Sequence, residues 1–158
     1  HYIGIDIIEI ARIKKAIARW GEGFLHRVYT EPELKLYYKK PSSLAARFAG
    51  KEAVVKALGA QAKGISWKEI EILSDSSGKP LVHLYGKARN QANGLGLNNL
   101  AISLSHSREY AIACVAGEAK KYAPVVSGRE LVGLVETGEN QDALLRIEMG
   151  DPKLYIMG

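Results

Sequence analysis

Three charged side chains have the types and the spacing for chemistry on a phosphate ester. Glu52 and Lys56 lie four residues apart in Arg47–Gly59, a stretch of good helix formers, so they share one helical face with Phe48. Asp6 lies in a separate apolar segment near the start of the chain. Hard cations such as Mg²⁺ bind one or two carboxylates together with phosphate oxygens and water. Because a nearby lysine neutralises phosphate charge, these residues suit magnesium-assisted chemistry on a diphosphate.

Each of these residues also has a purely structural interpretation. Glu52 and Lys56 could form an exposed i,i+4 salt bridge beside a core phenylalanine, which is a common support of helices. Asp6 could cap the helix that follows it, because Asp accepts hydrogen bonds from the free N–H groups at a helix start. The residues alone do not place Asp6 beside Glu52, so both alternatives stay open.

The helix that carries Glu52 is expected to begin at Ser42 or Ser43 and to end at Gly59. Leu44 and a row of small residues should face the core, and the row consists of Ala45, Ala49, Ala53 and Ala57. Small side chains at this spacing allow a second element to pack very close to the helix. We therefore expect this helix to be the centre of the fold.

The other elements alternate between helices and short strands. Strands are expected at residues 2–8, 65–73, 81–85, 100–107 and 110–116, and helices at residues 9–20, 30–38 and 86–93. Thr30 and Glu33 have the spacing of a capping box, whereas residues 24–29 form only a short apolar piece. Turn clusters at residues 75–80 and 107–109 predict hairpins. The pattern indicates an α+β fold with a small antiparallel sheet on a long central helix.

The totals are those of an ordinary soluble globular protein. The 158 residues are 47% hydrophobic and 25% charged, which suits one domain with a real core. No apolar run approaches the roughly 20 residues that span a bilayer, and no signal peptide is visible. The single cysteine, Cys114, lies in an apolar run and is expected to be a buried thiol. These features favour a cytoplasmic protein without membrane association.

Positive charge is concentrated in the first half of the chain. Residues 1–68 contain 13 basic and 6 acidic side chains, whereas residues 69–158 contain 9 and 11. A basic half predicts an anionic partner, which could be a nucleic acid, the phosphates of a cofactor or an acidic protein. The helix at residues 9–20 places Arg12, Lys15 and Arg19 outward, so it is either a solvated surface or a docking surface for an acidic helix.

The character of the chain changes at residue 120. Residues 122–158 contain 3 basic and 6 acidic side chains and are too apolar to be simply disordered. Apolar pieces at residues 125–126, 131–135, 144–149 and 154–157 alternate with turn residues. We expect one domain at residues 1–119 and a β-rich C-terminal extension at 120–158, packed on that domain or on a neighbouring subunit.

Five segments resemble the holo-(acyl-carrier-protein) synthases, which are small 4′-phosphopantetheinyl transferases. Gly4–Arg12 is similar to their G-x-D-x-x-x-x-x-R opening, and Arg47–Ala57 is similar to their R-F-A-x-K-E-A-x-x-K-A core. The others are Phe24–Leu34, Gly78–Pro80 and Ser103–Ala111. Together they cover about residues 2–118 in the family's order, whereas residues 120–158 match none of its motifs.

The resemblance implies the phosphopantetheinyl transferase fold and an activity. The activity is Mg²⁺-dependent transfer of the 4′-phosphopantetheine arm of coenzyme A to a serine of apo acyl carrier protein, releasing adenosine 3′,5′-bisphosphate. Carried over by motif, Asp6 and Glu52 would hold Mg²⁺ and Lys56 would contact the phosphates. The proton acceptor would be a metal-bound water, or Glu52 acting through one. The carrier protein would belong to fatty acid or polyketide synthesis.

The resemblance also implies binding surfaces. Coenzyme A would contact Arg47, Lys56, Gly78, Lys79, Pro80, Ser105, His106 and Ser107. Arg12, Lys15 and Arg19 would bind the acidic carrier protein, and a homotrimer would form its sites between subunits. Two alternatives are a basic nucleic-acid-binding module, which would not depend on Asp6, and a non-catalytic carrier-binding subunit, which would not need Glu52.

Overall fold

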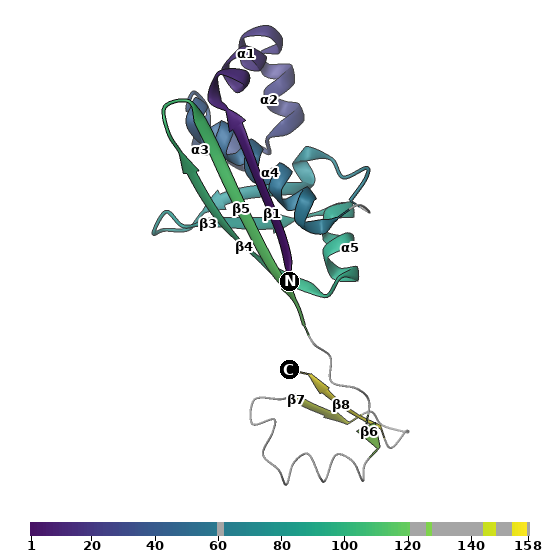
Figure 1. Ribbon diagram of the computed structural model, residues 1–158. Coiled ribbons are helices and arrows are strands. Elements are labelled where there is room, and N and C mark those ends of the chain that lie inside the picture. Colours follow the sequence, from purple (N-terminus) through teal and green to yellow (C-terminus); the bar gives the residue numbers. More distant parts are fainter. Residues whose placement is uncertain (60–61, 121–125, 128–143, 148–152, 158) are drawn as a thin grey trace. The chain divides into compact units, whose positions relative to one another are not determined.

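The computed structural model describes residues 1–59, 62–120, 126–127, 144–147 and 153–157. These residues belong to two compact units, His1–Ala119 and Lys120–Gly158, which are described separately. The first unit has the predicted α+β architecture, with an antiparallel sheet packed on a long helix (Figure 1). In the second unit, the short strands β6 (Val126–Ser127), β8 (Lys153–Met157) and β7 (Leu144–Ile147) form an antiparallel sheet in that order. The strand expected at residues 131–135 lies outside the described residues.

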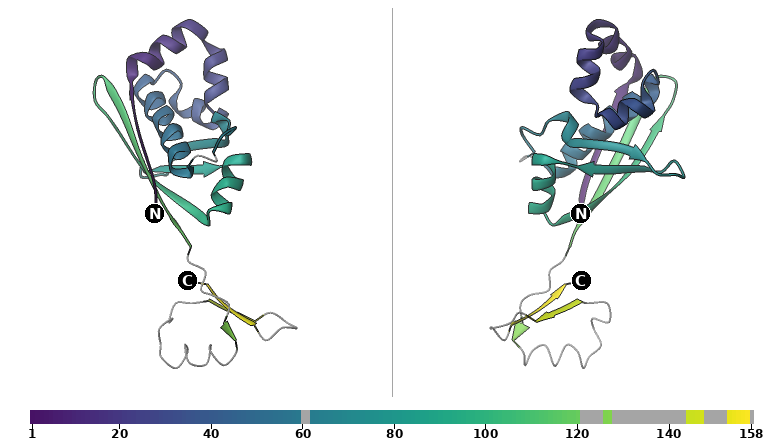
Figure 2. Two further views of the ribbon diagram at one scale, coloured as in Figure 1. Left: turned by 45° about the vertical axis from the view of Figure 1, so that its right-hand side comes forward. Right: turned by 180° about the vertical axis from the view of Figure 1, so that it is seen from behind.

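The main sheet of the first unit has the strand order β1, β5, β4. Its strands are β1 (Tyr2–Glu9), β5 (Tyr110–Ala119) and β4 (Leu97–His106), all antiparallel to their neighbours. Helix α4 (Pro41–Leu58) lies along one face of this sheet (Figures 1 and 2). A hairpin of β2 (Ile70–Ser74) and β3 (Pro80–Leu84) also contacts α4 and β4.

Shorter helices complete the unit. They are α1 (Ile10–Trp20), α2 (Glu22–Val28), α3 (Glu31–Tyr37), the 3₁₀ turn η1 (Trp67–Glu69) and α5 (Gly86–Gly94). The capping box predicted for α3 is confirmed, because the Thr30 N–H donates to Glu33 Oε1 at 2.9 Å and the Glu33 N–H donates to Thr30 Oγ1 at 3.3 Å.

The row of small residues on α4 has the predicted function. Ala45, Ala49 and Ala53 are fully buried, and Ala57 is nearly so. Strand β1 crosses this row at Gly4 so closely that a Cβ there would overlap the carbonyl oxygen of Ala53. Because only glycine allows this approach, Gly4 sets the distance between β1 and α4.

Three secondary-structure expectations need correction. Helix α4 begins at Pro41 rather than at Ser42 or Ser43, because proline suits a first helical position. Residues 65–69 are not a strand, since Ser66 N–H donates to Glu69 Oε2 at 2.7 Å and stabilises the turn η1. The apolar piece at residues 24–29 is largely helical and belongs to α2.

Two expectations about burial were also wrong. Strand β1 is buried on one face only: Ile3, Ile5 and Ile7 are exposed on the face that points away from α4. Cys114 is likewise exposed, because it is directly opposite Ile5 on that same outer face. An apolar run therefore does not distinguish a strand buried on both faces from one with an uncovered apolar face. Among the residues that the structure describes, no helix is both long and apolar enough to cross a membrane.

Replacing Gly4 by alanine should destabilise the protein strongly, because the added methyl group meets the α4 backbone, which cannot move aside. We expect a loss of about 3 kcal/mol, measured as a melting temperature lowered by roughly 10 °C. Gly23→Ala is the matched control, since nothing lies near its Cβ position and it belongs to helix α2. The control should be neutral or stabilise by roughly 0.5–1 kcal/mol. Equal melting temperatures of the two variants would contradict the close approach.

Candidate functional site

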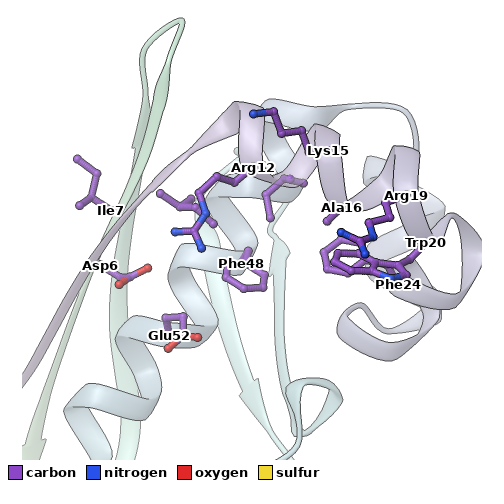
Figure 3. A pocket seen from close by; sticks show the side chains of 12 residues that line it. Asp6, Ile7, Arg12, Lys15, Ala16, Arg19, Trp20, Phe24, Phe48 and Glu52 are labelled. Carbon is purple, nitrogen blue, oxygen red and sulfur yellow. The ribbon is translucent and has the colours of Figure 1, made fainter.

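A cavity of about 540 Å³ contains both carboxylates singled out in the sequence. Asp6 reaches it from β1 and Glu52 reaches it from α4, and Figure 3 shows the two side chains at the same end of the cavity. Their meeting follows from the close packing at Gly4, because Asp6 is two residues further along β1 and therefore points to the same face. The structure thus brings together residues that are far apart in the sequence.

Lys56 joins this pair through Asp6. Its Nζ donates to Asp6 Oδ1 and to the carbonyl oxygen of Ile5, both at 3.0 Å. Within the described residues no ion pair links Lys56 to Glu52, so the simple i,i+4 salt bridge is not what the structure contains. The capping alternative for Asp6 is also wrong, since Glu9 precedes the first residue of α1.

The electrostatics of the pair favour a bound cation. Burial raises the pKa of Glu52, the negative charge of Asp6 raises it further, and Lys56 partly opposes the shift. Lys56 is paired with Asp6 rather than with Glu52, so Glu52 keeps an uncompensated part of this repulsion. A divalent cation between the two carboxylates would relieve it.

The two carboxylates resemble the protein ligands of a Mg²⁺ site more than those of a metal site whose ligands all come from the protein. Among the described residues there is no group of three or more His, Cys, Asp or Glu side chains that could hold a metal ion. Two carboxylates leave most of the coordination positions to other oxygens. Mg²⁺ is commonly bound in this way, by one or two carboxylates with phosphate oxygens and water.

Basic and aromatic side chains from α1, α2 and α4 form the rest of the cavity wall. The cavity is lined by Arg12, Lys15 and Arg19, as expected if these residues form a single binding surface. Figure 3 shows Arg12 near the carboxylate end and Arg19 at the far end, where its guanidinium lies 5.0 Å from the centre of the Trp20 ring. Lys15 projects from the rim.

Three aromatic residues of this wall were not predicted as site residues: Trp20, Phe24 and Phe48. Phe48 was a core residue only in the salt-bridge interpretation; it is partly buried and stacks on Trp67 with ring centres 4.8 Å apart. Trp20 is 59% exposed. A tryptophan at the end of a basic amphipathic helix, directly before Gly21, is the sequence signal that could have identified it.

The structure brings Arg47 close to the β2–β3 turn but not to the two carboxylates. Its Nη2 donates to the Tyr37 hydroxyl at 2.8 Å and to Ser74 Oγ at 3.1 Å. Ser74 pairs with Pro80, so the turn that contains Gly78 and Lys79 begins beside Arg47. Arg47 is buried, and its Nε has no hydrogen-bond partner among the described residues.

Ser105, His106 and Ser107 form a third group at the end of β4. All three are exposed, and none of them lines the cavity of Asp6 and Glu52. The Ser107 hydroxyl accepts hydrogen bonds from the N–H groups of Glu109 and Tyr110, which closes the predicted hairpin turn. Within one chain, the residues expected to bind coenzyme A therefore lie in separate places.

Comparison with known proteins places this arrangement in a family. The family model of the 4′-phosphopantetheinyl transferase superfamily matches residues 2–115. A holo-[acyl-carrier-protein] synthase of Dehalococcoides mccartyi is 57% identical over 117 residues, covering 74% of this chain and 98% of that protein. The corresponding synthase of Herpetosiphon aurantiacus is 49% identical over 121 residues, covering 72% and 95%.

Solved structures agree with this assignment. The Helicobacter pylori holo-[acyl-carrier-protein] synthase, crystallised with coenzyme A, has a TM-score of 0.65 and 37% identity, covering 73% of this chain and 99% of that chain. The Thermotoga maritima synthase has a TM-score of 0.62 and 28% identity. Its alignment covers 98% of this chain and 82% of that chain, so it extends into residues 120–158. The chain belongs to the 4′-phosphopantetheinyl transferase superfamily, in the family of the holo-[acyl-carrier-protein] synthases.

Proposed function

We propose that this protein transfers the 4′-phosphopantetheine group of coenzyme A to a serine of apo acyl carrier protein. The observation that carries the proposal is that Asp6 and Glu52 line one cavity while Lys56 binds Asp6, in a chain whose relatives are named for this reaction. Neither a nucleic-acid-binding module nor a non-catalytic carrier-binding subunit needs two carboxylates and a lysine at one point.

The reaction forms one bond and breaks another at a single phosphorus atom. The serine oxygen bonds to the phosphorus that carries pantetheine, and the bond from that phosphorus to adenosine 3′,5′-bisphosphate breaks. Mg²⁺ held by Asp6 and Glu52 would neutralise charge on the diphosphate. Lys56 would donate to the phosphate oxygens and stabilise the leaving group. A metal-bound water, or Glu52 acting through a water, would take up the serine proton.

The nucleotide half of coenzyme A is assigned to the two groups outside the cavity. Arg47 with Gly78, Lys79 and Pro80 forms one group, because Arg47 binds Ser74, which pairs with Pro80 beside the β2–β3 turn. The other group is Ser105, His106 and Ser107, whose hydroxyls and imidazole are exposed. Because these groups lie apart from Asp6 and Glu52 in one chain, we propose that a complete site combines residues of neighbouring subunits.

A homotrimer would supply those neighbours, and the main sheet has a surface suited to it. The face of β1 and β5 that points away from α4 exposes Ile3, Ile5, Ile7 and Ile112. No described helix of residues 1–119 covers this face, and uncovered apolar patches of this kind mark protein interfaces. We propose that these faces meet in the trimer.

We further assign the transferase domain to residues 1–119 and an extension to residues 120–158, in line with the two compact units. The extension would pack on this domain or on a neighbouring subunit. A cytoplasmic location stays a prediction, based on the single cysteine.

Incubation with apo acyl carrier protein, coenzyme A and Mg²⁺ should add one phosphopantetheine mass to the carrier, as measured by intact-mass spectrometry. EDTA should abolish the gain, because the two carboxylates would lose the cation between them. Glu52→Ala and Asp6→Ala should each lower turnover at least about 100-fold. Glu9→Gln is the control, since Glu9 follows on the same strand but does not line the cavity. Normal turnover in folded Glu52→Ala protein would exclude the assignment.

Arg12→Glu should weaken use of the carrier protein far more than binding of coenzyme A. We expect the KM for the carrier to rise about tenfold or more, while the KM for coenzyme A changes little, because a reversed charge repels an acidic partner. Lys14→Glu makes the same change on the same helix outside this cavity and should have a much smaller effect. The surface assignment fails if the two variants have equal KM values for the carrier.

Ile5→Lys should break the trimer without unfolding the subunit, since the side chain is 56% exposed in one chain. Light scattering should give three times the chain mass of 17.3 kDa for the unmodified protein and a smaller mass for the variant. If each active site combines residues of two subunits, the Ile5→Lys variant should also lose transferase activity. Leu36→Lys, also at an exposed leucine but on α3, should leave the mass unchanged. A trimer that survives Ile5→Lys would show that the contact lies elsewhere.

A further inference from the structure

A buried ion pair contains Lys51, the residue directly before the cavity residue Glu52. Lys51 and Glu33 are both completely buried, and Lys51 Nζ lies 2.7 Å from Glu33 Oε1. The ammonium also donates to the carbonyl oxygens of Trp67 and Ile70, so all three of its hydrogen atoms have acceptors. Buried ion pairs are costly to desolvate and are often replaceable by apolar side chains without loss of stability. Stability alone therefore does not explain this pair.

The pair connects four elements at one point. Glu33 is on α3, Lys51 is on α4, and the carbonyl groups of Trp67 and Ile70 belong to η1 and β2. The second carboxylate oxygen of Glu33 accepts a hydrogen bond from the Ile72 N–H at 3.0 Å. Any rotation or shift of α4 relative to β2 would break several of these bonds together.

Glu52 follows Lys51 directly on α4, so the two side chains point about 100° apart around the helix axis. Holding Lys51 against η1 and β2 consequently turns Glu52 toward the cavity and toward Asp6. Lys51 can fix the direction of Glu52 only if Lys51 itself is held in place. Its three hydrogen bonds hold it there.

The same anchor holds the aromatic wall next to Glu52. Trp67 accepts the bond from Lys51 through its carbonyl group, at 3.1 Å, and its ring stacks on Phe48 at an interplanar angle of 27°. Trp67 and Glu52 also line a second cavity, of about 160 Å³. One ammonium group thus fixes both the helix that carries Glu52 and the turn that supports Phe48.

We propose that the Lys51–Glu33 pair is a positioning unit, which orients Glu52 and holds the Phe48–Trp67 wall for the transfer step. The proposal rests on the proposed transferase function. The pair touches neither substrate nor metal, and its effect is on turnover rather than on the binding of coenzyme A.

The test removes both charges at once, so that no unpaired charge stays buried. In Lys51→Met with Glu33→Gln, the glutamine still offers an oxygen to the Ile72 N–H. The kcat per folded molecule should fall at least tenfold, while the KM for coenzyme A stays within about threefold. Leu97→Ala is the control: it removes buried volume beside Gly117 and away from the cavity, so it should lower the melting temperature while keeping kcat.

A spectroscopic measurement tests the same idea independently of activity. Trp20 and Trp67 are the two tryptophans of the chain, so a Trp20→Phe background leaves the emission of Trp67 alone. The double variant in this background should show red-shifted emission and stronger quenching by acrylamide, because Trp67 loses the hydrogen bond from Lys51 to its carbonyl group. Leu97→Ala in the same background should leave the emission unchanged.

The outcomes separate the two proposals. No transfer by the unmodified protein would end the proposed function, and the Trp67 emission would still test the positioning unit. An unchanged kcat, or an unchanged Trp67 emission, in folded double variant would overturn the positioning unit alone. If the double variant does not fold, Glu33→Gln by itself should change kcat and emission in the same directions by smaller amounts, and no change in either would overturn the proposal.

Discussion

The contact between Gly4 and helix α4 is the constraint on which the site depends. Backbone meets backbone here, with no side chain between β1 and the Ala53 carbonyl group. The buried alanines of α4 make room for this approach. Two residues further along the strand, Asp6 reaches the cavity that Glu52 also lines. The short distance between β1 and α4, which the absence of a side chain at Gly4 allows, thus determines where Asp6 and Glu52 meet.

Charge is arranged around this meeting point in two layers. At the cavity, Asp6 is paired with Lys56, and Glu52 faces the like charge of Asp6. In the interior, the charges of Lys51 and Glu33 compensate each other; burial lowers the pKa of Lys51, and Glu33 opposes that shift. The Lys51 ammonium has three hydrogen-bond acceptors in the interior, whereas the side chain of Lys56 is half-exposed.

Local patterns predicted most of the fold and the residue types of the candidate site. The spacing of Glu52 and Lys56, the capping box at Thr30 and the alanine row are short-range features, and the structure contains each of them. Pairings across the chain could not be predicted in this way. The partner of Lys56 is Asp6, fifty residues away in sequence, and nothing in the sequence near Lys51 indicated Glu33. Burial of β1 was also overestimated, because an apolar run does not show whether both faces of a strand are covered.

The alternation of side chains along β1 has a consequence for which mutations the chain can tolerate. Gly4, Asp6 and Ile8 face the helix, and Ile3, Ile5 and Ile7 face outward. A deletion or insertion of one residue would exchange the two sets and place an isoleucine against the α4 backbone. A shift of the strand by one position would remove the Asp6 carboxylate from the cavity and fill the space that Gly4 leaves against α4. The length of this strand is therefore constrained by the packing at Gly4 and by the position of Asp6 together.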